Sequence, residues 1–133
     1  MNKKTLLIAF LAIALFGCND DKKQETTLLD SITTVHDKIM ADDGVIMNKK
    51  MQLKGIAAKD ASKQDSVAAY TKTLGDADDV MMNWMNKFNP VFSGKSHQQI
   101  MDYLHQQQAE LVKINLTLDS AIKVSNNYIS KAK

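Results

Sequence analysis

The sequence is poor in turn-forming residues and contains no arginine. Among its 133 residues there are 5 glycines and 1 proline, whereas sandwiches and barrels of short strands need many residues that form tight turns. All 17 basic residues are lysines, so the planar guanidinium that grips phosphate or guanine through two parallel hydrogen bonds is missing. These absences favour an all-α fold and disfavour a nucleic-acid partner.

The only cysteine, Cys18, excludes an internal disulfide. It follows a basic start and an uncharged apolar run, Leu6–Phe16, that is too short to span a bilayer. The segment Leu15–Cys18 resembles the lipobox of bacterial lipoproteins, in which the cysteine becomes the lipidated N-terminal residue. This resemblance implies a lipoprotein signal peptide over residues 1–17 and an outer-membrane lipoprotein of the bacterial cell envelope, either periplasmic or surface-exposed. The alternative is a secreted protein with an incidental cysteine.

The mature chain would be electrically balanced and would form one domain. Two of the 17 lysines lie in the signal peptide, so 15 basic residues face 15 acidic residues after its removal. Residues 18–26 are predicted to be a lipidated flexible tether, and their charged start resembles the acidic export signals of Bacteroidota surface lipoproteins. A solvated linker without such a role is the alternative. Residues 27–133 are long enough for one compact domain.

Apolar residues recur at helical spacing in three segments of this domain. The spacing predicts a first helix over residues 27–59, a second over residues 62–88 and a third from residue 96 to the end of the chain. The first is predicted as one helix, although Gly44 is a candidate kink because glycine weakens a helix interior. Three helices of similar length with short connections predict an antiparallel up-down-up three-helix bundle with long helices.

The predicted helix starts carry polar caps. Ser62 is predicted to cap the second helix, and Ser96 with Gln99 has the spacing of a capping box for the third. In the third helix a seven-residue seam contains a glutamine, Gln107, which is expected to set the register. His97 and His105 lie on different faces of this helix and are expected to be solvated.

Two segments support a family resemblance. His36–Met40 in the first helix and Asp76–Met85 in the second resemble a group of small Bacteroidota lipoproteins that are often labelled "viral A-type inclusion protein", a name that implies no viral role. The resemblance implies a helical lipoprotein of unknown function. It adds no activity.

Methionine is the most unusual feature of the composition, because seven of the eight methionines follow the signal peptide. Thioethers are soft ligands that suit Cu(I). One hypothesis is therefore a soft-metal site that uses a histidine and methionines of facing helices. The other interpretation is that flexible methionine side chains fill a helical core. Six methionines are predicted to lie on core-facing arcs: Met40, Met47, Met51, Met81, Met82 and Met85. The candidate metal site consists of His36 with four of them, Met40, Met81, Met82 and Met85.

Asp78 falls on the apolar stripe of the second helix. A carboxylate there is costly unless it is paired, and His36 at a corresponding level of the first helix is the predicted partner. We interpret the two as a buried polar pair that fixes the register of the helices. As an active site the pair lacks a nucleophile, so the sequence predicts no catalytic residue and no enzyme.

Three serines, Ser31, Ser66 and Ser120, follow an aspartate and precede a small or aliphatic residue. This pattern resembles the O-glycosylation sites of Bacteroidota, and ordinary helix surface is the alternative interpretation.

Taken together, these patterns predict a lipid-anchored, non-enzymatic envelope lipoprotein that acts as a helical binding, spacer or interaction module. Its expected partners are the membrane, through the N-terminal lipid, and a protein that the sequence does not identify. No cofactor is expected. The alternative is an envelope protein that binds a soft metal such as Cu(I) through the methionine and histidine cluster.

Overall fold

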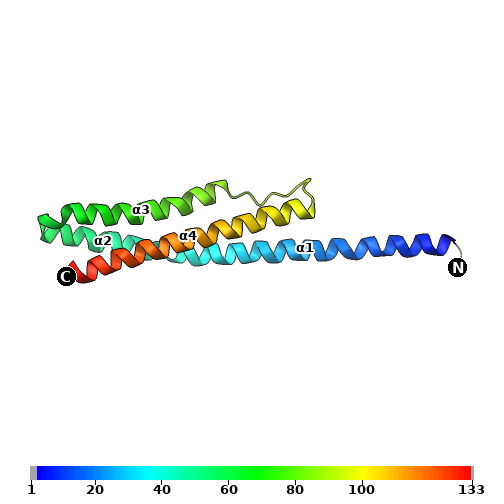
Figure 1. The fold of residues 1–133 in the computed structure, drawn as a ribbon, viewed down its shortest axis with the longest axis horizontal. Helices are drawn as coiled ribbons and strands as arrows, with labels where there is room; N and C mark the ends of the chain where they lie inside the picture. The colour runs from blue at the N-terminus through cyan, green and yellow to red at the C-terminus, as the bar shows by residue number, and fades with distance from the viewer. Residues whose placement is uncertain (1–2, 133) are drawn as a thin grey trace.

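The computed structural model describes the backbone of residues 3–132 and the side chains of residues 20–132. Over this range the chain is helical and contains no strand. The predicted all-α fold class is therefore confirmed. The elements, in chain order, are α1 (Lys3–Ala41), α2 (Asp43–Lys59), the 3-10 turn η1 (Ala61–Lys63), α3 (Gln64–Lys87) and α4 (His97–Ala132), as Figure 1 shows.

The helices lie side by side and form a rod. In Figure 1, α2 continues the direction of α1, α3 returns beside α2, and α4 runs along the others. The packing agrees, because α4 contacts α1, α2 and α3, while α3 also contacts α2. The N-terminal part of α1 extends beyond the end at which α3 connects to α4.

The predicted first helix is interrupted at one residue. α1 ends at Ala41 and α2 begins at Asp43, so the prediction of one unbroken helix is wrong at Asp42. Its backbone N–H donates to the carbonyl of Ile39 at 3.0 Å, three residues back instead of four, which tightens the last turn of α1. Asp42 keeps near-helical angles, φ −80° and ψ −11°, so the chain continues in the same direction. Gly44, the candidate kink, lies inside α2.

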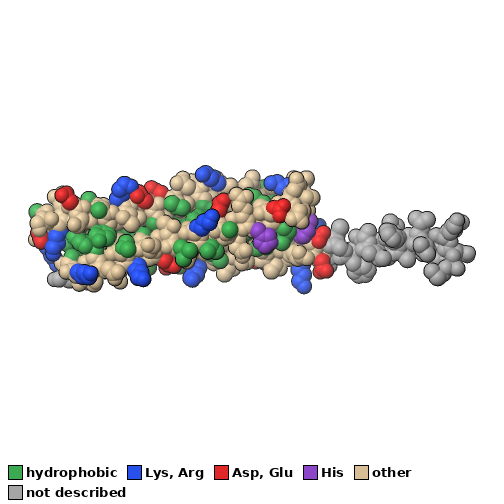
Figure 2. Space-filling model, in the orientation of Figure 1, with side chains coloured by type: hydrophobic (Ala, Val, Ile, Leu, Met, Phe, Trp, Pro, Cys, Tyr) green, Lys and Arg blue, Asp and Glu red, His purple; other side chains and the backbone are tan. Residues whose placement is uncertain are grey.

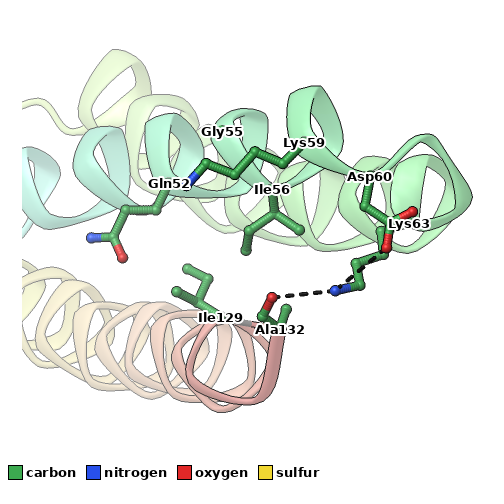
Figure 3. Close-up of a pocket in the computed structure, with 8 residues that line it drawn as sticks. All are labelled: Gln52, Gly55, Ile56, Lys59, Asp60, Lys63, Ile129 and Ala132. Carbon is green, nitrogen blue, oxygen red and sulfur yellow. Dashed lines mark hydrogen bonds and ion pairs between the residues drawn. The ribbon is translucent and has the colours of Figure 1, made fainter.

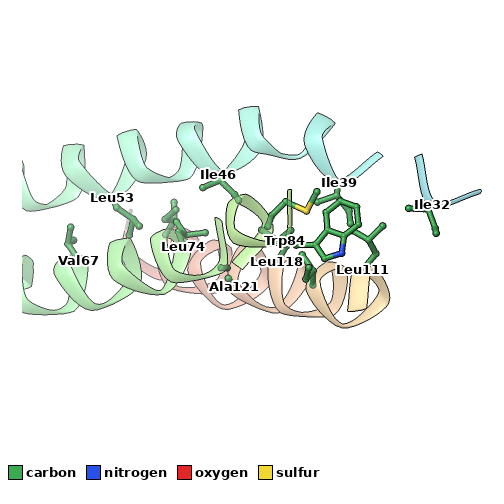
Figure 4. Close-up of a cluster of buried hydrophobic side chains, with 14 of the residues drawn as sticks. Ile32, Ile39, Ile46, Leu53, Val67, Leu74, Trp84, Leu111, Leu118 and Ala121 are labelled. Carbon is green, nitrogen blue, oxygen red and sulfur yellow. The ribbon is translucent and has the colours of Figure 1, made fainter. Parts of the chain in front are cut away.

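The core is a narrow seam with a seven-residue repeat. In α1 and α2 the most buried residues, between 0% and 3% exposed, are each seven residues apart: Ile32, Ile39, Ile46 and Leu53. The repeat is unbroken across Asp42, so α1 and α2 present one continuous apolar stripe. Figure 4 shows Ile39, Ile46 and Leu53 on the side of their helices that faces α3 and α4, where Leu74 and Leu111 lie, and Ile32 farther along α1. Helical spacing predicts nine seam residues in α4, of which the first eight are buried and Tyr128 is half-buried: Ile100, Leu104, Gln107, Leu111, Ile114, Leu118, Ala121, Ser125 and Tyr128.

Caps mark two of the helix starts. Ser96 N–H donates to Gln99 Oε1 at 2.9 Å and Gln99 N–H donates to Ser96 Oγ at 3.3 Å, which confirms the predicted capping box. The predicted Ser62 cap of the second helix is wrong, because α3 follows Lys63 without a side-chain cap. Asp60 instead caps the 3-10 turn η1 that precedes α3. The Asp60 carboxylate accepts hydrogen bonds from the Ser62 hydroxyl at 2.6 Å and from its N–H at 3.0 Å. These bonds lower the pKa of Asp60, and the bond from the Ser62 hydroxyl has the larger effect.

Residues 20–26 are helical and form part of α1, which corrects the prediction of a flexible tether there. The helix is held by His97, whose Nδ1 lies 2.9 Å from Glu25 Oε1 and whose Nε2 lies 3.7 Å from Asp21 Oδ1. His97 is thus half-buried and paired, not solvated as predicted, while His105 is exposed. The side chains of the predicted signal peptide and of Cys18 are not among those that the structure describes. Within the described residues, no helix is both long and apolar enough to cross a bilayer.

Candidate functional site

The predicted pair of His36 and Asp78 is not formed. His36 Nδ1 lies 2.9 Å from Asp37 Oδ1, and Asp78 Oδ2 lies 3.8 Å from Lys50 Nζ. The helix levels explain the difference, because His36 faces Trp84, which lies about 9 Å along α3 from Asp78 at 1.5 Å per residue. Asp78 keeps 33% of its side chain exposed, so its carboxylate lies at the surface beside Lys50 and not in the core.

A row of rings runs from His36 on α1 through Trp84 and Phe88 to Tyr103 on α4. The ring centroids of His36 and Trp84 are 6.0 Å apart, and Trp84 stacks on Phe88 at 4.8 Å. Phe88 lies 6.2 Å from Tyr103 of α4, whose hydroxyl accepts a hydrogen bond of 2.8 Å from the N–H of Asn89. This row therefore ties the loop before α4 to the bundle. Trp84 is buried on α3 and Phe88 follows the end of this helix, and the contact between Phe88 and Tyr103 depends on how α3 and α4 pack.

The methionines are mostly on the flanks of the seam. Met81 is 2% exposed and belongs to the core. Met40 is half-buried. The other four predicted core methionines are exposed: Met47, Met51, Met82 and Met85. The prediction for these four is wrong because the bundle buries a narrow seven-residue seam and not the wide arc that helical spacing alone allows.

The candidate metal residues are therefore only partly gathered. His36 and Met40 are half-buried and one turn apart on α1, and Met81 is in the core. Met82 and Met85 lie toward solvent on α3. Among the described histidine, cysteine and acidic side chains, no group of three lies close enough to hold a metal ion.

A groove with a lysine rim lies between α2 and α3, and we call it the α2/α3 groove. Its volume is about 680 Å³, and small or apolar side chains form its floor. Lys50 and Lys54 stand on the α2 side and Lys72 on the α3 side. This groove was not predicted from the sequence. The sequence shows Lys50 and Lys54 one turn apart beside Met51, but which helix lies opposite them is decided by packing.

A second depression lies at the end of the rod where α2 turns into α3, and it has a structural role. Figure 3 shows Ile56 and Ile129 facing each other across it. Lys63 Nζ donates to the carbonyl of Ala132 at 3.2 Å and lies 3.6 Å from Asp60 Oδ2. These contacts fasten the last turn of α4 to the turn before α3.

Apolar side chains reach the surface elsewhere along the rod. Figure 2 shows hydrophobic side chains in patches on the visible face, with lysines and carboxylates around them. The most exposed large apolar residues of α4 are Leu116 and Val112, at 63% and 53%. Apolar contact surface is therefore available outside the grooves.

The three candidate glycosylation serines all lie within helices. Ser66 on α3 and Ser120 on α4 are exposed. Ser31 on α1 is half-buried, and its hydroxyl accepts a hydrogen bond of 3.3 Å from Gln108 of α4. Ser31 is thus less accessible than the other two.

Known proteins provide no comparison for these sites. No family model, no curated protein and no solved structure matches this chain.

Proposed function

We propose that this protein is a lipid-anchored, non-enzymatic lipoprotein of the bacterial envelope, and that it acts as a helical interaction module held away from the membrane. The lipobox-like segment at Cys18 supports the anchor. The α2/α3 groove is the observation that carries the interaction role, because it combines small and apolar side chains on its floor with lysines on both rims. The resemblance to small Bacteroidota lipoproteins is part of the same proposal.

We also propose that the chain is an up-down-up three-helix bundle in which α1 and α2 count as one helix, interrupted at Asp42. The unbroken seven-residue repeat across Asp42 supports this arrangement. So do the cross-helix contacts, since Lys49 Nζ bonds Asn126 Oδ1 at 2.8 Å and Gln108 bonds Ser31. Both bonds join residues separated by the same 77 positions, as expected for two helices that run in the same direction.

The geometry supports a spacer role as part of this proposal. Cys18 precedes Asp21 by three residues of α1, and Asp21 contacts His97 at one end of the bundle. The lipid would thus be attached at that end. Lys54 lies 36 residues beyond Cys18, which is about 54 Å along a continuous helical direction at 1.5 Å per residue. The α2/α3 groove would be presented at that distance from the bilayer.

Lipid attachment is tested by metabolic labelling with palmitate. The full chain is expected to take up the label and to remain with the outer-membrane fraction, whereas Cys18→Ala is expected to lose the label and to be released. All of the acyl chains would be attached to Cys18, the only cysteine, so the loss of label and of the stable anchor is expected to be complete. An unlabelled full chain that stays in the soluble fraction would overturn the anchor.

A second proposal is a soft-metal site centred on His36. The observation in its favour is the hydrogen bond between His36 Nδ1 and Asp37, since a carboxylate that holds one ring nitrogen orients the other toward a ligand. Met40 lies one turn away. Titration with Ag(I), followed by Trp84 fluorescence, is expected to show one equivalent bound. His36→Ala is expected to abolish this binding and His105→Ala to keep it, whereas equal behaviour of the two variants rejects the site.

A further inference from the structure

The α2/α3 groove has a floor that a helix could approach closely. Val67, which is 7% exposed, lies at its base. Around it are the small side chains of Ala57, Ala68 and Thr71. Packed helices approach to about 8–10 Å between their axes, and small residues at the contact favour the lower end of this range. The floor therefore suits the apolar face of another helix.

The rims of the groove carry charge of one sign. Three lysines line it, and no carboxylate does. Two of the lysines have ion-pair partners on α3 outside the lining: Lys50 lies 3.8 Å from Asp78, and Lys72 lies 2.6 Å from Asp76. Among the described residues no ion pair is found for Lys54. The groove therefore offers Lys54 as an uncompensated cation. Lys50 and Lys72 can bind a carboxylate of a partner in addition to their own aspartates.

The length of the groove matches about two turns of helix. Its lining runs from residue 50 to residue 57 on α2 and from residue 64 to residue 72 on α3, or about 11–12 Å at 1.5 Å per residue. Met51 and Met47, at 59% and 58% exposure, extend the apolar stripe outward along α2. Methionine side chains adapt to different partners because they are unbranched and polarizable.

We infer that the α2/α3 groove binds an amphipathic α-helix of a partner protein, whose apolar residues at positions i, i+3 or i+4, and i+7 fill the groove and whose acidic residues flank them. Helix-in-groove binding uses this anchor spacing. Charges beside an apolar helical seam select the partner by their sign, and lysines on both rims select Asp and Glu. This inference rests on the proposed function, because it names the partner of the interaction module.

The test uses the full chain in nanodiscs of zwitterionic lipid, with empty discs as the blank. The probes are two 14-residue fluorescein-labelled peptides that share leucine anchors at the spacing above and carry either Glu or Lys on both flanks. Binding is measured by fluorescence anisotropy. The Glu peptide is expected to bind and the Lys peptide is not. Charge reversal of the three rim lysines together, K50E/K54E/K72E, is expected to weaken binding of the Glu peptide about tenfold, as three exposed charge pairs would.

Matched controls separate the groove from general charge effects. Lys123→Glu reverses one exposed lysine of α4, outside the groove, and is expected to leave the affinity unchanged. Methyl NMR of the unaltered chain is expected to show shifts for Met51 on peptide addition and none for Met101 of α4. Thermal unfolding of each variant by circular dichroism verifies that the bundle is folded, and Met51→Glu supplies a second groove variant if the triple one is not.

Several outcomes would overturn the inference. They are absence of binding of either peptide, equal binding of both, and equal weakening by Lys123→Glu and the groove variants. Self-association that the groove variants remove would assign the groove to a second copy of this chain and would also overturn it. The palmitate experiment tests the lipid anchor independently. A chain that is not lipidated but binds the Glu peptide would refute the anchor, while the inference about the groove would stand.

Discussion

Replacement of Ser125 by alanine is expected to stabilise the protein. Ser125 is 0% exposed in the core between the helices, and within the described residues its hydroxyl has no hydrogen-bond partner. A buried hydroxyl without a partner costs about 1–3 kcal/mol of folding free energy. Alanine removes that cost, leaves a void of one oxygen atom, and is the better helix former by about 0.5 kcal/mol. We expect Ser125→Ala to gain about 1–2 kcal/mol in the free energy of unfolding.

The matched control is Ser120→Ala on the same helix. Ser120 is exposed, so this variant gains only the helix-propensity part, about 0.5 kcal/mol. Both free energies are measured by urea unfolding followed by circular dichroism. The two midpoints are expected to differ while the slopes agree, because the surface exposed on unfolding is the same. A gain for Ser125→Ala no larger than that for Ser120→Ala would show that the buried hydroxyl is satisfied and would refute the reasoning.

Three further predictions concern the turn, the glycines and the N-terminal helix. Asp60→Ala should lower the melting temperature at neutral pH. Hydrogen bonds lower the folded-state pKa of Asp60, so the difference in melting temperature from the unaltered chain should shrink as the pH falls below about 3.9, the ordinary carboxyl pKa. A difference that does not change with pH would contradict this prediction. Gly94 has φ +77°, so Gly94→Ala should lower the free energy of unfolding in urea by about 1 kcal/mol. Gly44 lies in α2 with open space around its Cβ position, so Gly44→Ala should raise that free energy by up to about 1 kcal/mol. A change of the same sign in the two variants would contradict this prediction. His97→Ala should accelerate amide hydrogen exchange over residues 20–26 and leave α2 unchanged, and unchanged exchange at residues 20–26 would show that the pairing does not hold that segment.

The sequence by itself determined the helices and several of their ends. The capping box at Ser96 depends on residues three positions apart, and the seam of α4 repeats within every two turns. Hydrogen bonds and periodicities of this kind are satisfied inside one segment, so they can be read before any packing is known. The same holds for the all-α class, which follows from the scarcity of turn formers.

Only the tertiary structure decided which flank of each stripe is buried and which residues meet across helices. Met51 and Met82 share helical arcs with core residues, yet they are exposed because two neighbouring helices cover a narrow seam. Asp78 meets Lys50 and not His36 because the axial level of α3 against α2 is fixed by the turn at Asp60 and by all the seam contacts together. Such levels and rotations are collective properties of packed helices, whereas a helical period in one segment states only that some face will be buried.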